Sequence, residues 1–356
     1  MNPTMTPEEF AAMANTDDTI PIPANDDWKT DAALRRIERR MIRDENNPAG
    51  FAAFCQAVLA VGITDAGNML FIELGGVING LRRLKPCDND TVRILFEKTR
   101  RAIHDLPDGP RKERLDGLWD YNAGIFAREN GEYDLAARSQ ESGAKKAEQA
   151  GNREGAAICA FTAAVEWVNH ALVTDHGLAQ AVQRLLDTQN NMATVPPTSN
   201  EYHWVMFNAP AHRIVATFWA GVQYDQLDID IQTLRQLHTN DPNMAQAHES
   251  TLAVCSAIHA LAKGDTDRAS LLAQGVIYHH TDEVHPDYLA TAHLVLARIT
   301  LFRISGHRGS NLSHNQEDVH RQYKSIINLP QEGAFQVRAV ARRELAGIND
   351  TDRNAD

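Results

Sequence analysis

The sequence is poor in cysteine, in aromatic residues and in long apolar runs, and each shortage excludes a class of protein. Its four cysteines lie far apart and form no C-x-x-C pair, which excludes a disulfide framework and a zinc-finger spacing. Phe, Trp and Tyr make up only 6% of the 356 residues, and this favours closely packed helices over a β-sandwich. No apolar run approaches the roughly 20 residues that cross a bilayer, and no signal peptide is recognisable at the N-terminus. We therefore expect a cytoplasmic protein without a membrane partner.

Three of the cysteines lie within apolar stretches with helical spacing: Cys55, Cys159 and Cys255. A thiol in such surroundings is usually a small core residue, because reactive cysteines lie in exposed, electropositive places. The sequence therefore predicts buried, unreactive thiols at these three positions.

Motifs that carry catalysis are also missing. The chain has no G-x-x-x-x-G-K-[ST] loop, no G-x-G-x-x-G loop and no G-x-S-x-G turn. Carboxylate pairs such as Asp228 with Asp230 fall in loops or tails rather than in the apolar pockets that tune a pKa for catalysis. We predict that the protein is not an enzyme and binds no cofactor.

One cluster of metal-ligating residue types occurs, in the segment Y-H-H-T-D-E-V-H-P-D at 278–287. It lacks the H-E-x-x-H spacing and lies where a helix passes into a loop, a place where polar residues gather without any metal. We predict no metal there, and a metal-dependent hydrolase is the weakest hypothesis for the chain. The residues concerned are His279, His280, Asp282, Glu283 and His285.

Charge is distributed unevenly along the chain, whose net charge is −12. Residues 1–27 hold acids but no Lys or Arg, residues 28–115 carry a small excess of positive charge, and the remainder is acidic. The basic segment can therefore dock on the acidic body or face an anionic partner.

Arginines crowd the predicted helix at 33–43, which includes Arg36 and Arg40. Arginine pairs well with phosphate and carboxylate, so this helix is a candidate contact for nucleic acid. Against that interpretation, no helix-turn-helix is recognisable, aromatic residues do not interleave the arginines, and acidic neighbours offer partners within the helix. A contact with protein, or with the rest of this chain, is the preferred interpretation.

Apolar spacing of three and four residues predicts an all-α chain. We expect a disordered acidic tail at 1–27, a basic helical module at 28–110, paired helices at 111–346 and a disordered tail at 347–356. The module includes a helix at 91–105. The predicted pairs are 112–129 with 133–149, 153–172 with 176–189, 201–222 with 227–238, 243–263 with 266–279 and 286–304 with 316–328, followed by a last helix at 333–346.

The first of these pairs contains the stretch Y-N-A-G-I-F-A-R-E-N-G-E-Y-D-L-A-A-R-S. Gly124 and Ala136 are spaced to meet where the two helices cross, Gly131 permits the turn, and Tyr133 covers it. In a tetratricopeptide repeat a small residue stands at the eighth position, glycine at the fifteenth, an aromatic at the seventeenth and alanine at the twentieth. The segment resembles such a repeat, with Gly124, Gly131, Tyr133 and Ala136 at these positions in that order. The eleventh position, Ala127, and the twenty-fourth, Gln140, depart from that pattern because a large residue is usual at both.

The pattern recurs in weaker form downstream. Ala257, Gly264 and Ala269 fit the eighth, fifteenth and twentieth positions of another repeat, and Ala181 fits a twentieth position. The intervals between repeats exceed the usual 34 residues, so the resemblance is closer to long-helix arrays such as kinesin light chains and peptide-sensing bacterial regulators. A generic α-solenoid or helical bundle stays open as an alternative.

The resemblance implies a superhelix whose concave groove binds a protein or peptide. Carried onto this chain, the groove positions include Tyr121, Asn122, Ile125 and Arg128 in the first pair, and Glu166, Trp167 and His170 in the second. The expected function is a non-enzymatic scaffold or regulatory subunit that assembles or inhibits an effector. The alternative is a peptide- or nucleic-acid-responsive regulator that uses Arg36 and Arg40.

Overall fold

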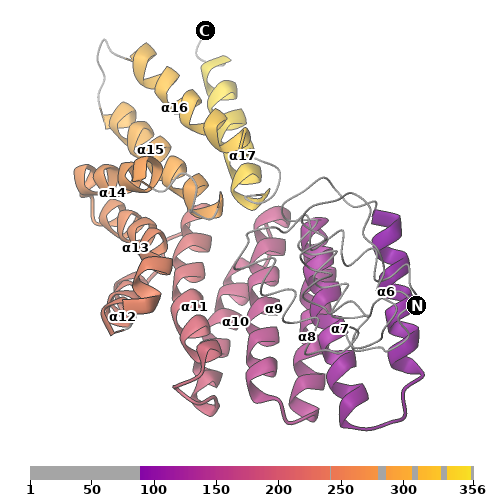
Figure 1. Ribbon diagram of the computed structural model, residues 1–356. Helices are drawn as coiled ribbons and strands as arrows, with labels where there is room; N and C mark the ends of the chain where they lie inside the picture. The colour runs from indigo at the N-terminus through magenta and orange to yellow at the C-terminus, as the bar shows by residue number, and fades with distance from the viewer. Residues whose placement is uncertain (1–88, 241, 280–285, 307–311, 330–334, 354–356) are drawn as a thin grey trace, which may run out of the picture. The chain divides into compact units, whose positions relative to one another are not determined.

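The computed structural model describes residues 89–240, 242–279, 286–306, 312–329 and 335–353 (Figure 1). Throughout these ranges the regular structure is helical, which confirms the predicted all-α class. The helices are α6 (Asn89–His104), α7 (Pro110–Glu129), α8 (Tyr133–Gln149), α9 (Arg153–Thr174), α10 (Leu178–Asn191), the 3-10 turn η4 (Met192–Thr194), α11 (Asn200–Trp219), α12 (Leu227–Asn240), α13 (Pro242–Ala262), α14 (Thr266–His279), α15 (Pro286–Gly306), α16 (Leu312–Ile327) and α17 (Phe335–Arg353).

The helix pairs match the predicted ones closely, and the differences lie at helix ends. The predicted helix 201–222 stops at Trp219, because Gly221 adopts a left-handed φ of 68° that ends the helix. The last helix begins at Phe335 and continues to Arg353, so most of the stretch predicted as a disordered tail at 347–356 is helical. The predicted helices before residue 89 lie outside the described residues.

The chain divides into two compact units, residues 1–159 and 160–356, and the boundary falls within α9. In the first unit, α6 packs on α7 through aromatic contacts. The Phe96 and Trp119 rings meet edge to face at 5.8 Å, and Trp119 Nε1 donates a hydrogen bond of 3.0 Å to the Phe96 carbonyl. Ile103 and Leu115 bury a small apolar cluster beside this contact.

Helices α7 and α8 approach closely because glycines line their crossing. A Cβ on Gly143 would lie 3.1 Å from the Gly117 carbonyl oxygen, so any larger residue there would push the helices apart. Gly131 adopts a φ of 77° in the connecting turn, as predicted, and Tyr133 is buried beside it.

Gln140 of α8 lies against Gly124 at the helix crossing. The atoms nearest to where a Gly124 Cβ would lie all belong to Gln140, one helical turn beyond Ala136, and the closest is at 2.6 Å. The Gln140 side chain fills this space, and its Nε2 donates a 2.8 Å hydrogen bond to the Tyr121 carbonyl. Gln140 therefore supplies the bulk that the repeat pattern expects at this position, in polar form.

An ionic contact also joins α7 and α8. Lys146 Nζ lies 2.7 Å from a carboxylate oxygen of Asp116 and 2.7 Å from one of Asp120, and Ser142 donates to Asp120 as well. Burial alone would lower the pKa of Lys146, but the two hydrogen-bonded carboxylates outweigh it and raise that pKa.

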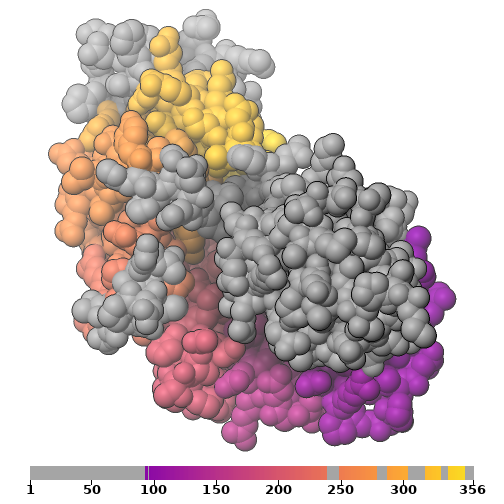
Figure 2. Space-filling view, in the orientation of Figure 1, coloured from indigo at the N-terminus to yellow at the C-terminus, as the bar shows by residue number. Residues whose placement is uncertain are grey.

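In the second unit, the helices from α10 to α17 pack mainly on their neighbours in sequence, and their surfaces run from pink to yellow in Figure 2. Helix α15 also contacts α13 and α17, so the C-terminal helices pack as one group. The apolar core includes residues from each of these helices, among them Val205, Ile231, Ala257, Leu294 and Val340.

Arg298 on α15 ties three helices of this unit together. Its guanidinium donates to the carbonyls of Phe218 and Trp219 at the end of α11, where a cation complements the helix dipole. It also pairs with Glu344 of α17, which accepts a hydrogen bond from Tyr323 of α16. Burial raises the pKa of Tyr323, and the Glu344 carboxylate raises it further.

Helix α17 also reaches the end of α9. Arg343 donates a 3.2 Å hydrogen bond to the Leu172 carbonyl and pairs with Asp175 at 3.2 Å. The final helix therefore contacts the first helix of its unit, although 171 residues separate Arg343 from Leu172.

By length and composition alone, α9 is the helix among those described that could cross a membrane, and 56% of its most apolar window is buried in the structure. It carries a buried polar pair, in which Asn169 Nδ2 donates to Glu166 at 2.9 Å. Such a pair also occurs in a buried core helix.

The two cysteines within the described ranges, Cys159 and Cys255, are free and buried, as predicted. Burial raises the pKa of the Cys159 thiol to about 12, and the nearby Asp120 carboxylate adds to the shift. The pKa of Cys255 is also raised by burial. Both residues are thus protonated core thiols at neutral pH. Cys55 lies outside the described residues.

Candidate functional site

Four of the predicted groove residues lie on α7, and they divide by exposure. Asn122 is 1% exposed and donates from Nδ2 to the Leu118 carbonyl at 2.7 Å, and Ile125 is 7% exposed. These two side chains belong to the packing of the helix rather than to an open surface. Tyr121 and Arg128 are partly exposed and stay candidates for contact with a partner.

The three predicted residues on α9 divide in the same way. Glu166 is fully buried beside Asn169, so its side chain is not accessible to a partner protein. Trp167 and His170 are half-buried, and their rings meet edge to face at 5.8 Å. The alternation follows from the helical repeat, because Glu166 and Trp167 point about 100° apart around the axis.

Arg36 and Arg40 lie outside the described residues, as do the positions from 280 to 285 that hold most of the histidine cluster. Among the described residues no group of three His, Cys, Asp or Glu side chains could hold a metal ion.

Trp167 and His170 line a cavity of about 340 Å³ between α9 and α10, which we name the Trp167 cavity. Its other walls come from the turn between the two helices and from the first turns of α10. Gly177 adopts a φ of 80° there, which allows the chain to reverse before Leu178 starts α10. The cavity is lined by Trp167, His170, Ala171, His176, Gly177, Gln180, Ala181 and Arg184.

The Trp167 cavity is aromatic and cationic. The Arg184 guanidinium carbon lies 4.9 Å from the centre of the Trp167 ring, within the range of a cation–π contact. His176 Nδ1 donates to the Thr174 carbonyl at 2.8 Å, which fixes the orientation of this ring. The first turn of α10 holds no acidic residue, so its backbone dipole adds positive potential to that of Arg184.

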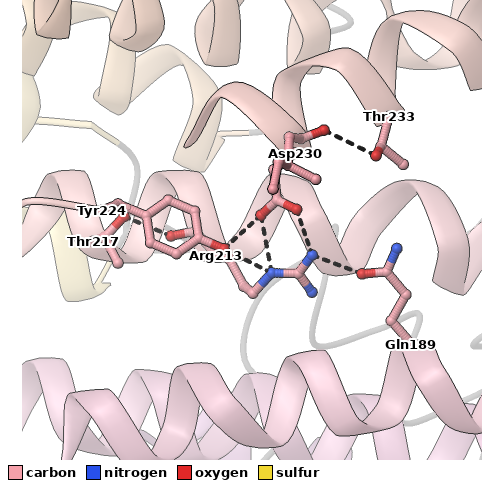
Figure 3. A network of polar contacts seen from close by, with 7 residues as sticks. Gln189, Arg213, Thr217, Tyr224, Asp230 and Thr233 are labelled. Atoms are coloured by element: carbon pink, nitrogen blue, oxygen red, sulfur yellow. Dashed lines mark hydrogen bonds and ion pairs between the residues drawn. The ribbon is translucent and has the colours of Figure 1, made fainter. Parts of the chain in front are cut away.

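A second polar centre, which the sequence analysis missed, lies between α10, α11 and α12 (Figure 3). The prediction that Asp228 and Asp230 fall in a loop is wrong, because both lie in the first turn of α12 and Asp230 is 3% exposed. Arg213 of α11 pairs side-on with Asp230 of α12, with Nε to Oδ2 at 3.0 Å and Nη2 to Oδ1 at 2.7 Å. Tyr224 donates to Asp230 at 2.6 Å, and Nη2 of Arg213 donates to Gln189 of α10 at 2.6 Å. One planar guanidinium therefore links three helices.

Burial governs the ionisation of this centre. It would lower the pKa of Arg213, but hydrogen bonds and charge attraction from Asp230 raise that pKa above its usual value. It raises the pKa of Tyr224, which keeps the phenol protonated. The sequence signal was a single arginine within the mostly apolar run A-P-A-H-R-I-V-A-T-F-W, where a charge requires a partner.

A cavity of about 420 Å³ adjoins this centre, and we name it the Arg213 cavity. It lies between α10, the second half of α11 and the loop that leads into α12. The lining residues are Leu178, Ala179, Val182, Gln183, Leu186, Arg213, Thr217, Val222, Gln223, Tyr224, Asp225 and Gln226.

Comparison of this chain with protein-family models, with curated proteins and with solved structures finds no match. The resemblance to tetratricopeptide repeats therefore rests on the residues quoted above.

Proposed function

We propose that the protein is a non-enzymatic binding module, in which tetratricopeptide-like helical hairpins form a solenoid that holds a protein or peptide partner. A scaffold or regulatory subunit is the role that fits such a module. The observation that carries this proposal is the Trp167 cavity, which combines a half-buried indole, an arginine and two histidines in about 340 Å³. Tryptophan and arginine are the residue types that dominate binding energy at protein interfaces.

The chemistry of the cavity favours a carboxylate-bearing side chain on the partner. Arg184 can donate a charge-assisted hydrogen bond, and the positive end of α10 attracts the same group. The Trp167 ring offers an apolar wall to the methylene groups that carry the carboxylate. We propose that an acidic segment of the partner binds here.

The test is affinity capture from the native cell with the tagged full-length chain, with and without nuclease, for the parent and for Arg184→Glu combined with His170→Ala. Both side chains lie at the cavity, and the charge reversal repels a carboxylate. We expect recovery of a discrete protein to fall about tenfold, corresponding to roughly 1.4 kcal/mol. Arg268→Glu is the control, because Arg268 is exposed on α14 and lies outside the cavity lining.

Two outcomes contradict the proposal. Equal recovery with the cavity variant and the parent removes the Trp167 cavity from the interface. Recovery of mainly nucleic acid that disappears after nuclease treatment transfers the function to the arginine-rich segment around Arg36 and Arg40. Matching thermal unfolding curves for the parent and the variants establish that a loss of capture does not reflect unfolding.

A further inference from the structure

The turn between α9 and α10 has an unusual backbone. Asp175 directly follows α9 and adopts a φ of 61°, and among the described residues every other positive φ belongs to a glycine. Glycine is the usual residue at such a helix end, because a side chain is strained in the left-handed region. Gly177 adopts a φ of 80° two residues later. The chain therefore reverses through two left-handed residues, and one of them carries a side chain.

This turn is also a wall of the Trp167 cavity. Ala171, His176 and Gly177 line the cavity, so lining residues lie on both sides of Asp175. The His176 amide donates to the Ala171 carbonyl at 3.2 Å across the turn. A bond of this kind, from the second residue after a helix end, forms when the first residue after that end is left-handed. The position of His176 in the wall therefore depends on the φ of Asp175.

Arg343 of α17 contacts the turn at two points. Its Nη1 lies 3.2 Å from Asp175 Oδ1, and its Nη2 donates to the Leu172 carbonyl at 3.2 Å. That carbonyl is among the last four of α9, which have no partner inside the helix. One guanidinium thus holds both the side chain of Asp175 and the end of the helix that precedes it.

The contact is too exposed to contribute much to global stability. The Arg343 and Asp175 side chains are 46% and 81% exposed, and an exposed ion pair usually contributes little. Helix α17 has other attachments, since Glu344 pairs with Arg298 and Val340 is buried. A strained backbone persists where surrounding contacts over-determine it, and such residues gather at binding sites. The Arg343 contact therefore acts on the shape of the turn rather than on the docking of α17.

We propose that Arg343 is a positioning residue of the Trp167 cavity, which holds Asp175 in its left-handed conformation and thereby keeps His176 and Gly177 in the cavity wall. The inference rests on the proposed function for what binds there, a carboxylate-bearing segment. It adds regulation, because binding in the cavity then depends on α17. Since coupling between two sites is reciprocal, a partner in the cavity also favours the docked helix.

Substitutions at two positions separate backbone shape from charge. Arg343→Ala removes both contacts to the turn. Adding Asp175→Gly restores the wall, because glycine adopts the left-handed φ without help, whereas adding Asp175→Ala removes the same carboxylate but disfavours that φ. Arg342→Ala, at the exposed neighbouring position of α17, is the control.

Fluorine NMR of the full-length protein labelled with 5-fluorotryptophan gives two readouts. The first is the chemical shift of Trp167 in the free protein, assigned among the five tryptophans with Trp167→Phe. Because Trp167 lines the same cavity, its resonance reports on a change in the wall. The second is the Kd of the probe N-acetyl-glutamate-N′-methylamide, titrated against that resonance.

We expect Arg343→Ala to shift the Trp167 resonance and to weaken probe binding about fivefold, at the lower end of typical couplings between sites. The double variant with Asp175→Gly should return both readouts close to those of the parent. The double variant with Asp175→Ala should resemble Arg343→Ala alone, and Arg342→Ala should resemble the parent.

The proposal is overturned if Arg343→Ala leaves the Trp167 resonance of the free protein unmoved. It is also overturned if Asp175→Ala restores the readouts as well as Asp175→Gly, because the effect is then one of charge, or if Arg342→Ala acts like Arg343→Ala. A fall in thermal stability that accompanies Arg343→Ala and that Asp175→Gly does not reverse assigns Arg343 to the docking of α17 instead.

These outcomes are distinguishable from failure of the proposed function. If the probe does not bind the parent, the carboxylate preference of the cavity is wrong, and the Trp167 resonance of the free variants still decides the role of Arg343. If the probe binds the parent and Arg184→Glu abolishes its binding, while Arg343→Ala changes neither readout, the proposed function stands and the positioning role fails.

Discussion

At the scale of single residues, small and buried side chains decide how closely the helices pack. Gly124 is an example, because Gln140 occupies the space that a side chain at 124 would need. Its replacement by a larger residue requires either Gln140 or a whole helix to move. The hydrogen bond from Gln140 to the Tyr121 carbonyl would be lost in the first case.

We expect Gly124→Ala to destabilise the protein by about 1–3 kcal/mol, because an added methyl group overpacks the α7–α8 contact. The measurement is urea unfolding followed by circular dichroism. Gly275→Ala is the matched control: beyond the backbone of α14 itself, no described atom lies within 4 Å of its Cβ position, so alanine should stabilise by about 0.4–1 kcal/mol. Equal effects of the two substitutions would contradict the packing role of Gly124.

A second residue-scale prediction concerns His293. Burial lowers its pKa, although the hydrogen bond from Nδ1 to Gln322 at 2.7 Å opposes the shift. The unfolded chain then binds a proton more readily than the folded one. The contribution of His293 to stability is therefore complete above the unfolded pKa of about 6.5 and is lost as the pH falls below it.

We expect the free energy of unfolding of the parent to fall between pH 7 and pH 5, and His293→Asn to reduce that slope by up to about 1.4 kcal/mol per pH unit. Urea titrations at several pH values measure the slopes. An unaltered slope in His293→Asn would show that other groups govern the acid response.

At the scale of helices, polar side chains join elements that are distant in sequence. Arg298 and Glu344 connect the end of α11 to α15, α16 and α17, and Arg343 connects α17 to the end of α9. The last helix is held by charged hydrogen bonds in addition to its apolar face.

Glu344→Ala should cost about 1.5–3 kcal/mol, the usual value of a hydrogen bond to a charged group, because Arg298 and Tyr323 both lose their acceptor. We also expect hydrogen exchange of α17 to accelerate before that of α13. Arg342→Ala, on an exposed face of the same helix, should change stability by less than about 0.5 kcal/mol. If α17 keeps its protection in Glu344→Ala, its apolar face alone is enough to dock it.

At the scale of the whole molecule, α9 is the continuous helix that crosses from the first compact unit to the second. Cys159 lies against Gly143 of α8 in the first unit, and the Phe161 ring meets the Trp204 ring of α11 at 4.9 Å in the second. Both units therefore depend on the integrity of this helix.

Ala160→Pro should destabilise the protein by about 3 kcal/mol or more, because proline removes a helical hydrogen bond and clashes with the preceding turn. We expect amide protection to fall in both α8 and α11. Ala160→Gly lowers helix propensity without breaking the backbone and should cost about 1 kcal/mol. Loss of protection confined to one unit would show that the other holds its fold without the intact helix.

The sequence by itself determined the helical class, the helix pairs and the turns at Gly131, Gly177 and Gly264. Apolar spacing and glycine at helix ends are local properties, readable within one or two turns of chain. Trp167 and His170, which line a cavity, came from the repeat resemblance, and the same mapping also selected Glu166, which is buried.

Tertiary structure alone decided which polar residues meet. Nothing local indicates that Arg213 pairs with Asp230 and Gln189, that the Gln140 side chain lies against Gly124, or that Arg343 reaches back to α9. It also decided that Asn122, Ile125 and Glu166 are buried, since burial depends on which neighbouring helices cover a face. A polar residue within an apolar segment indicates that its side chain needs a hydrogen-bond partner. Only the fold brings that partner within hydrogen-bond distance.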